Sequence, residues 1–154
     1  MMKKRKKRIM IIGARNCGKT SLANHINDYH GKLRKVQDTI YSKYTIDVPS
    51  GYIENAWMYM HTIALSQDAC CILLMVDQSR PAMVYSPGFA RVFKCPVVGV
   101  ISKKDLCSEN AEACEEQLRQ IGVSAPYFYI NNETGEGIDE LKEYINESGV
   151  IELE

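Results

Sequence analysis

The stretch that decides the fold is Gly13-Ala14-Arg15-Asn16-Cys17-Gly18-Lys19-Thr20. It matches in full the glycine-rich loop pattern that binds phosphates. The apolar run at residues 8–12 predicts a buried strand before the loop, and the segment from Lys19 to about Tyr29 predicts a helix after it. Strand, loop and helix in this order make the match specific.

The chemistry of such a loop follows from its backbone. Glycines let the chain wrap tightly, so that amide N–H groups point at phosphate oxygens, and the helix N-terminus adds a partial positive charge. Lys19 then reaches the β- and γ-phosphates, and the Thr20 hydroxyl is a ligand for Mg²⁺. The phosphate-binding residues expected here are Gly13, Asn16, Cys17, Gly18, Lys19 and Thr20.

Cys17 has two open interpretations. A helix N-terminus beside phosphates favours a thiolate, whereas a variable loop position carries no such role.

The rest of the chain alternates strands and helices. Asn110 is expected to cap one of the helices, and Trp57, Met60 and Ala64 share a helix face that we expect to pack on the sheet. This alternation predicts an α/β fold, a mostly parallel sheet with helices on both faces, as one nucleotide-binding domain over residues 1–154. Further strands are predicted near 39–41 and over 44–48, 69–76, 97–101 and 127–130, and further helices over 56–67, over 110–121 and from 138 onward.

Composition excludes several classes of protein. Hydrophobic residues make up 45% of the 154, and 19 basic side chains balance 19 acidic ones, so the chain is not a disordered tail or a nucleic-acid coat. The longest apolar run, residues 69–76, is far shorter than the ~20 residues that span a bilayer. No signal peptide is recognisable.

Charge and cysteine placement add to this picture. Lys and Arg make up residues 3–8, so that the segment 1–8 is either a solvated terminus or a contact for an anionic partner. The six cysteines form no Cys-x-x-Cys pair, which favours reduced thiols, with Cys70 and Cys71 buried. A cytoplasmic location fits best.

Three further segments are candidates for the nucleotide site. Asp47 ends a predicted strand, where an aspartate holds Mg²⁺ in phosphate-loop proteins. Asp105 follows the next buried strand but one, and its carboxylate can accept hydrogen bonds from the N1–H and the N2 amine of guanine, a donor pair that adenine lacks. Lys103 can lie along the base or ribose. The loop from Asn131 to Ile138 offers backbone N–H groups to the guanine carbonyl, or it is an ordinary turn into the last helix.

Taken in order, these segments resemble the small Ras-like GTPases and, more closely, the EutP/PduV family of ethanolamine and propanediol utilisation. The resemblance covers Arg8 to about Glu147. It implies binding of GTP or GDP with Mg²⁺ and adds Ser21 and Ser102 to the nucleotide site, beside Lys103, Asp105, Asn131 and Asn132. The stretches that carry it are residues 13–21, 34–37, 46–55, 101–105 and 134–138.

The family accompanies bacterial microcompartments. The resemblance therefore implies a bacterial, cytoplasmic protein whose partners are a nucleotide and shell or pathway proteins.

Departures from the family pattern bear on catalysis. Val36 stands where the family has a Mg²⁺-binding threonine, and Ser50 stands where Asp-x-x-Gly has its glycine. Gly51 has no side chain to orient a water molecule. The Asn-Lys-x-Asp motif begins with Ser102, and no Ser-Ala pair is found at residues 131–132. These departures predict slow GTP hydrolysis.

Three functions remain open from the sequence. The first is a guanine-nucleotide-binding switch or scaffold protein. The second is a nucleotide-dependent kinase of a small carboxylate such as acetate. The third is a structural protein that keeps the fold without turnover.

Overall fold

A six-stranded sheet forms the centre of the computed structural model, which describes residues 7–29, 39–81 and 85–153. The strand order is β2-β3-β1-β4-β5-β6, and only β2 runs antiparallel to its neighbour among the described strands. The predicted mostly parallel α/β fold is confirmed. The strands are β1 (Arg8–Ile12), β2 (Ile40–Tyr41), β3 (Thr45–Asp47), β4 (Ala69–Asp77), β5 (Val97–Ser102) and β6 (Tyr127–Tyr129).

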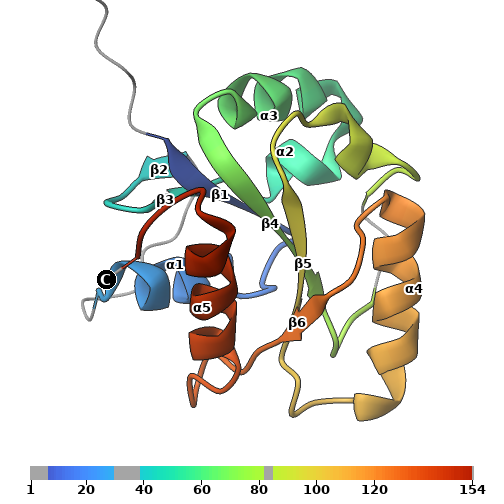
Figure 1. The fold of residues 1–154 in the computed structure, drawn as a ribbon. Coiled ribbons are helices and arrows are strands. Elements are labelled where there is room, and N and C mark those ends of the chain that lie inside the picture. Colours follow the sequence, from blue (N-terminus) through green and yellow to red (C-terminus); the bar gives the residue numbers. More distant parts are fainter. Residues whose placement is uncertain (1–6, 30–38, 82–84, 154) are drawn as a thin grey trace, which may run out of the picture.

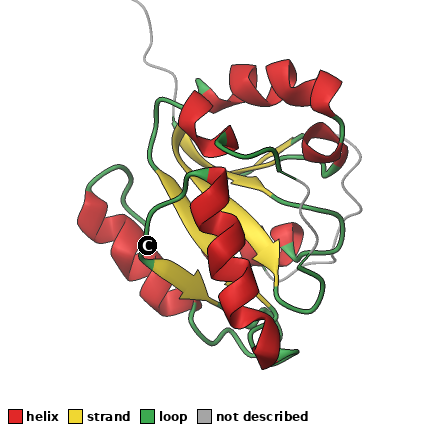
Figure 2. Ribbon diagram, turned by 90° about the vertical axis from the view of Figure 1, so that its right-hand side faces the viewer, coloured by secondary structure: helices red, strands yellow, loops and turns green. Residues whose placement is uncertain are grey.

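Helices cover both faces of this sheet (Figure 1 and Figure 2). Alternate residues of β1 divide between two cores, because successive strand side chains point to opposite faces. Ile9 and Ile11 pack in the core shared with α1 (Lys19–Asn27) and α5 (Ile138–Ser148). Met10 and Ile12 pack in the core that includes residues of α2 (Gly51–Glu54) and α4 (Ala111–Ile121).

The predicted strands and helices agree with the structure to within a few residues, with three differences. The first is that residues 51–54 form the short helix α2, which the sequence pattern does not predict. The second is that the segment predicted as one helix over 56–67 is a 3₁₀ turn, η1 (Ala56–Met58), followed by α3 (Tyr59–Ser66). Further 3₁₀ turns are η2 (Phe89–Val92) and η3 (Ser108–Asn110).

The third difference is that Asn110 makes no side-chain cap hydrogen bond to α4. Its amide instead donates to the carbonyl of Gln78 at 3.0 Å, which ties the start of α4 to the loop after β4.

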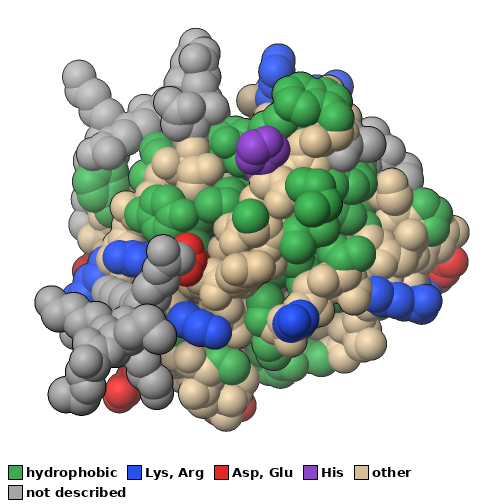
Figure 3. All heavy atoms as spheres, turned by 90° about the horizontal axis from the view of Figure 1, so that it is seen from above, with side chains coloured by type: hydrophobic (Ala, Val, Ile, Leu, Met, Phe, Trp, Pro, Cys, Tyr) green, Lys and Arg blue, Asp and Glu red, His purple; other side chains and the backbone are tan. Residues whose placement is uncertain are grey.

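The expectation for Trp57, Met60 and Ala64 is wrong. Trp57 is 76% exposed and Met60 is 73% exposed, and Ala64 is exposed as well. Tyr59, Ile63 and Leu65 pack on the core instead, so α3 turns its other face to the sheet. Figure 3 shows apolar side chains gathered on the outer surface over this part of the molecule.

The cysteine expectations are confirmed where the structure tests them. Cys70 and Cys71 are buried, and all six cysteines are free thiols. Within the described residues there is no group of three or more His, Cys, Asp and Glu side chains that could hold a metal. Nor does the described part contain a helix long and apolar enough to cross a membrane.

Two sequence features lie outside the described residues. They are most of the basic segment 1–8 and the stretch around Val36.

Substitution of a buried and of an exposed helix residue should change the stability of the protein by very different amounts. Leu141→Ala in α5 removes a fully buried side chain and should lower the free energy of unfolding by about 2–5 kcal/mol. Met60→Ala removes an exposed one and should change it by less than about 0.5 kcal/mol. Urea unfolding followed by circular dichroism measures both. A loss of several kcal/mol in Met60→Ala would mean that the outer face of α3 is packed.

Candidate nucleotide site

The loop between β1 and α1 lies at the carboxyl ends of the parallel strands. Gly18 takes up a left-handed conformation, with φ of 100°, directly before the first residue of α1. A Cβ at this position would overlap the side-chain amide of Asn132. Glycine is therefore required twice over, by the backbone conformation and by the close approach of the opposite loop.

Lys19 lies back over this loop rather than out into solvent. Its side chain is buried, and its Nζ donates to the carbonyl of Ala14 at 3.1 Å. The ammonium group is thus held inside the ring of the loop, where it would meet an anion bound by the amides.

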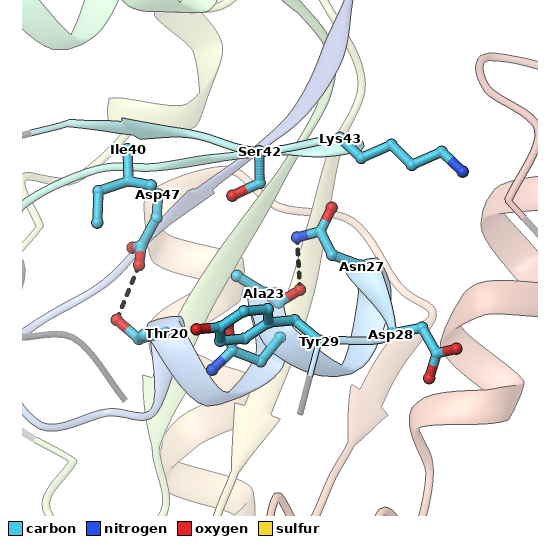
Figure 4. A pocket seen from close by; sticks show the side chains of 10 residues that line it. Thr20, Ala23, Asn27, Asp28, Tyr29, Ile40, Ser42, Lys43 and Asp47 are labelled. Atoms are coloured by element: carbon cyan, nitrogen blue, oxygen red, sulfur yellow. Dashed lines mark hydrogen bonds between the residues drawn. The ribbon is translucent and has the colours of Figure 1, made fainter. Parts of the chain in front are cut away.

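Thr20 and Asp47 meet at the start of α1. The Thr20 hydroxyl donates to Oδ2 of Asp47 at 2.8 Å (Figure 4). Asp47 reaches this position because its strand pairs with β1 in register, Asp47 opposite Ile11. The pairing of β1 with β3 thus brings together two residues that are 27 positions apart.

The other oxygen of Asp47, Oδ1, is buried and has no hydrogen-bond partner among the described residues. Burial raises the pKa of this carboxyl, while the Thr20 hydroxyl and the Lys19 charge oppose the rise. An unsatisfied buried carboxylate oxygen beside a hydroxyl is a set of ligands that suits Mg²⁺. The residues present therefore fit the metal.

A cavity of about 260 Å³ opens beside this pair, between α1 and the β2–β3 hairpin (Figure 4). Thr20 and Asp47 line one end of it, and Asn24 and Asn27 line its α1 side. The Asn27 amide is already engaged, donating to the Ala23 carbonyl and the Thr45 hydroxyl.

Cys17 lies fully inside the loop. It is 1% exposed, and burial raises the pKa of its thiol to about 11, against the lowering effect of Lys19. The thiol is therefore neutral at physiological pH, which removes the thiolate interpretation. Asn16 is exposed and has a positive φ of 62°.

The residues after β5 divide into structural and accessible ones. Ser102 is fully buried, and its hydroxyl donates to the Val76 carbonyl at 3.4 Å. Lys103 pairs with Asp77 at 2.8 Å. Burial alone would raise the pKa of Asp77, but the hydrogen bonds from Lys103 and Ser79 hold it below its usual value. Asp105 is exposed.

The loop after β6 is joined to both neighbouring loops. Asn131 is buried, and its Oδ1 accepts from the backbone N–H groups of Glu133 and Thr134, so its side chain shapes the turn. The Asn132 amide donates to the Gly18 carbonyl at 3.2 Å. Lys104 pairs with Glu136 at 2.6 Å, which links this loop to the segment that carries Asp105.

Three contacts were not predicted from the sequence. His25 Nε2 lies 2.8 Å from the Asn132 carbonyl, Asp77 pairs with Lys103, and the backbone N–H of Arg15 donates to Oε1 of Glu54 at 3.0 Å. Glu54 stood inside a stretch that carries the family resemblance, yet its role depends on where α2 places it.

Comparison with known proteins identifies the family of this chain. The family model described as "Ethanolamine utilisation - propanediol utilisation" matches residues 6–147. The chain belongs to the PduV-EutP family. The propanediol utilization protein PduV of Citrobacter freundii is 35% identical over 91% of this chain and 93% of its own length. The "Probable acetate kinase EutP" of Escherichia coli K12 is 26% identical over 90% of this chain and 89% of its own length.

Solved structures show the same fold. The translation elongation factor SelB of Methanococcus maripaludis, in complex with the GTP analogue GppNHp, superposes with a TM-score of 0.67. It is 21% identical over 94% of this chain and 34% of its own. This PduV-EutP protein therefore has the fold of the P-loop GTPases.

Proposed function

We propose that this PduV-EutP protein binds a guanine nucleotide with Mg²⁺ and serves ethanolamine or propanediol utilisation. The observation that carries the proposal is the Thr20–Asp47 pair at the end of the phosphate loop, with its buried carboxylate oxygen left over. The loop amides and Lys19 would hold the phosphates, and Thr20 and Asp47 would hold the metal. When bound, Mg²⁺ neutralises charge on the β- and γ-phosphates.

Preference for guanine rests on Asp105. The site segments after β5 and β6 lie side by side, since Ile101 pairs with Tyr129 and Lys104 pairs with Glu136. An exposed carboxylate at this edge can accept both guanine donors. The complex of the related fold with a GTP analogue supports the same base.

Membership of the family supports a proposal for the place of action. We propose a cytoplasmic protein whose partners, beyond the nucleotide, are microcompartment shell or pathway proteins.

A small-carboxylate kinase is the second candidate. The relatives named as probable acetate kinases favour it, and so does Gly51, which has no side chain to orient a water molecule for hydrolysis. In this reaction the γ-phosphoryl group passes to a carboxylate oxygen of acetate, which leaves a nucleoside diphosphate and acetyl phosphate.

The phosphate loop is tested by Lys19→Ala. Losing one charge-assisted contact, roughly 1.5–3 kcal/mol, should weaken binding of a fluorescent GDP analogue by about 10- to 150-fold. Lys94→Ala is the matched control, because Lys94 is exposed and precedes β5, at the opposite end of the sheet. Equal affinity in the Lys19 and Lys94 variants would remove the phosphate-loop assignment.

Base preference is tested by Asp105→Asn. The wild type should favour GTP over ATP in competition, because adenine leaves the carboxylate without donors. The variant should bind GTP more weakly and gain affinity for xanthosine triphosphate, since its amide offers a donor to the second carbonyl of xanthine. That gain is the internal control for folding. Wild-type protein that binds ATP as tightly as GTP would contradict the assignment of Asp105.

Turnover separates the two candidate functions. Single-turnover phosphate release from GTP, without partner proteins, should be as slow as ~10⁻⁴ s⁻¹, the rate of small GTPases that lack a partner's arginine. The same measurement with acetate should leave the rate unchanged and form no acetyl phosphate. Acetate-dependent loss of GTP with acetyl phosphate as product would establish the kinase. A rate near 1 s⁻¹ without acetate would contradict the prediction of slow hydrolysis.

A further inference from the structure

Glu54 places a negative charge on the phosphate loop. It is the last residue of α2, and its Oε1 accepts the backbone N–H of Arg15 at 3.0 Å, across 39 positions of sequence. This contact is defined by the packing of α2: Ile53, the preceding residue, is 1% exposed, and the backbone N–H of Glu54 donates to the Ser50 carbonyl at 3.0 Å. The packing of α2 thus positions the Glu54 carboxylate at the phosphate loop.

The amide that Glu54 contacts belongs to the set that would bind phosphate. Arg15 is the third residue of the loop, and the N–H groups of such loops are anion donors. The Arg15 amide already has an anionic acceptor, the Glu54 carboxylate. A phosphate group that approached the same amide would compete with the carboxylate for its hydrogen and would be repelled by its charge.

The side from which Glu54 approaches the phosphate loop indicates which phosphate of a bound nucleotide it would repel. The α2 helix begins four residues after Asp47, whose carboxylate meets Thr20 at the proposed metal position. In phosphate-loop proteins the metal bridges the β- and γ-oxygens. The segments with Asp105 and Asn132 follow β5 and β6, on the other side of β1 in the sheet. Glu54 therefore enters from the side of the terminal phosphate.

We propose that Glu54 is a specificity-determining residue that makes the site favour a nucleoside diphosphate over a triphosphate. The inference rests on the proposed nucleotide binding and goes beyond it. A diphosphate leaves the Glu54–Arg15 contact in place. A triphosphate has to displace the carboxylate or accept its repulsion, and either effect lowers affinity.

Displacement of Glu54 should also change the surroundings of a residue further along the chain. Trp57 follows three residues later, in η1, and is the only tryptophan of the sequence. Because no other tryptophan is present, tryptophan fluorescence reports on this segment alone. A triphosphate that releases Glu54 should shift the emission of Trp57, and a diphosphate should leave it unchanged.

The experiment compares wild type with Glu54→Gln and Glu54→Ala in the full chain. Calorimetry with Mg²⁺ gives the dissociation constants of GDP and of the non-hydrolysable analogue GppNHp. Glu54→Ala should tighten GppNHp binding about tenfold and change GDP binding by less than about twofold. Glu54→Gln keeps an acceptor oxygen without the charge and should fall between. Glu147→Ala removes an exposed charge at the far end of α5 and should match wild type.

A second readout needs no nucleotide. Hydrogen exchange at the Arg15 amide, followed by NMR, should be faster in Glu54→Ala than in wild type, which reports the contact itself. If GDP and GppNHp both bind and their affinity ratio is the same in Glu54→Ala as in wild type, the role of Glu54 is overturned while the proposed function stands. If neither nucleotide binds wild type, the proposed function is overturned, and the role of Glu54 with it.

Discussion

The turn from β1 into α1 is the constraint on which the rest of the site depends. Gly18 adopts a left-handed conformation with no room for a Cβ, because the Asn132 side chain packs against it and donates to its carbonyl. This single position sets the direction of α1, holds the loop after β6 against the phosphate loop, and brings Thr20 to the end of β3. A side chain at position 18 would be strained by the positive φ and would have to displace the Asn132 amide.

The site also retains an arrangement that does not favour stability. Asp47 is buried, with one oxygen bonded to Thr20 and the other without a partner in the part of the chain that the structure describes. A buried acceptor left unsatisfied costs about 1–3 kcal/mol, and a pair of apolar side chains of similar shape would avoid that cost. The proposed cation would supply the missing partner of Oδ1 and so offset this cost.

Much of the fold could be predicted because its signals are local. The apolar runs at residues 69–76 and 97–101 are long enough to define buried strands, and Leu141 and Ile145 repeat at helical spacing. The outer face of α3 could not be predicted in the same way. Periodicity shows that Trp57, Met60 and Ala64 share a face, but α3 is apolar on its other side too, where Tyr59 and Ile63 pack. Which of two apolar faces meets the sheet depends on the chain before it, here α2 and η1.

The candidate site likewise contains residues that local sequence signals predict and contacts that they do not. The phosphate loop, Thr20 and Asp47 could be found from the sequence because each stands at a strand end that the pattern reveals. Asn132 was expected in the site, but its contact to Gly18 was not, and neither were those of His25 and Glu54, because these contacts join segments that are remote in sequence. After β5, the buried Ser102 hydroxyl bonds to the Val76 carbonyl, and after β6 the Asn132 side chain contacts the phosphate loop. The phosphate loop is thus contacted by loops that neighbouring elements place against it, although the sequences of these loops depart from the usual motifs.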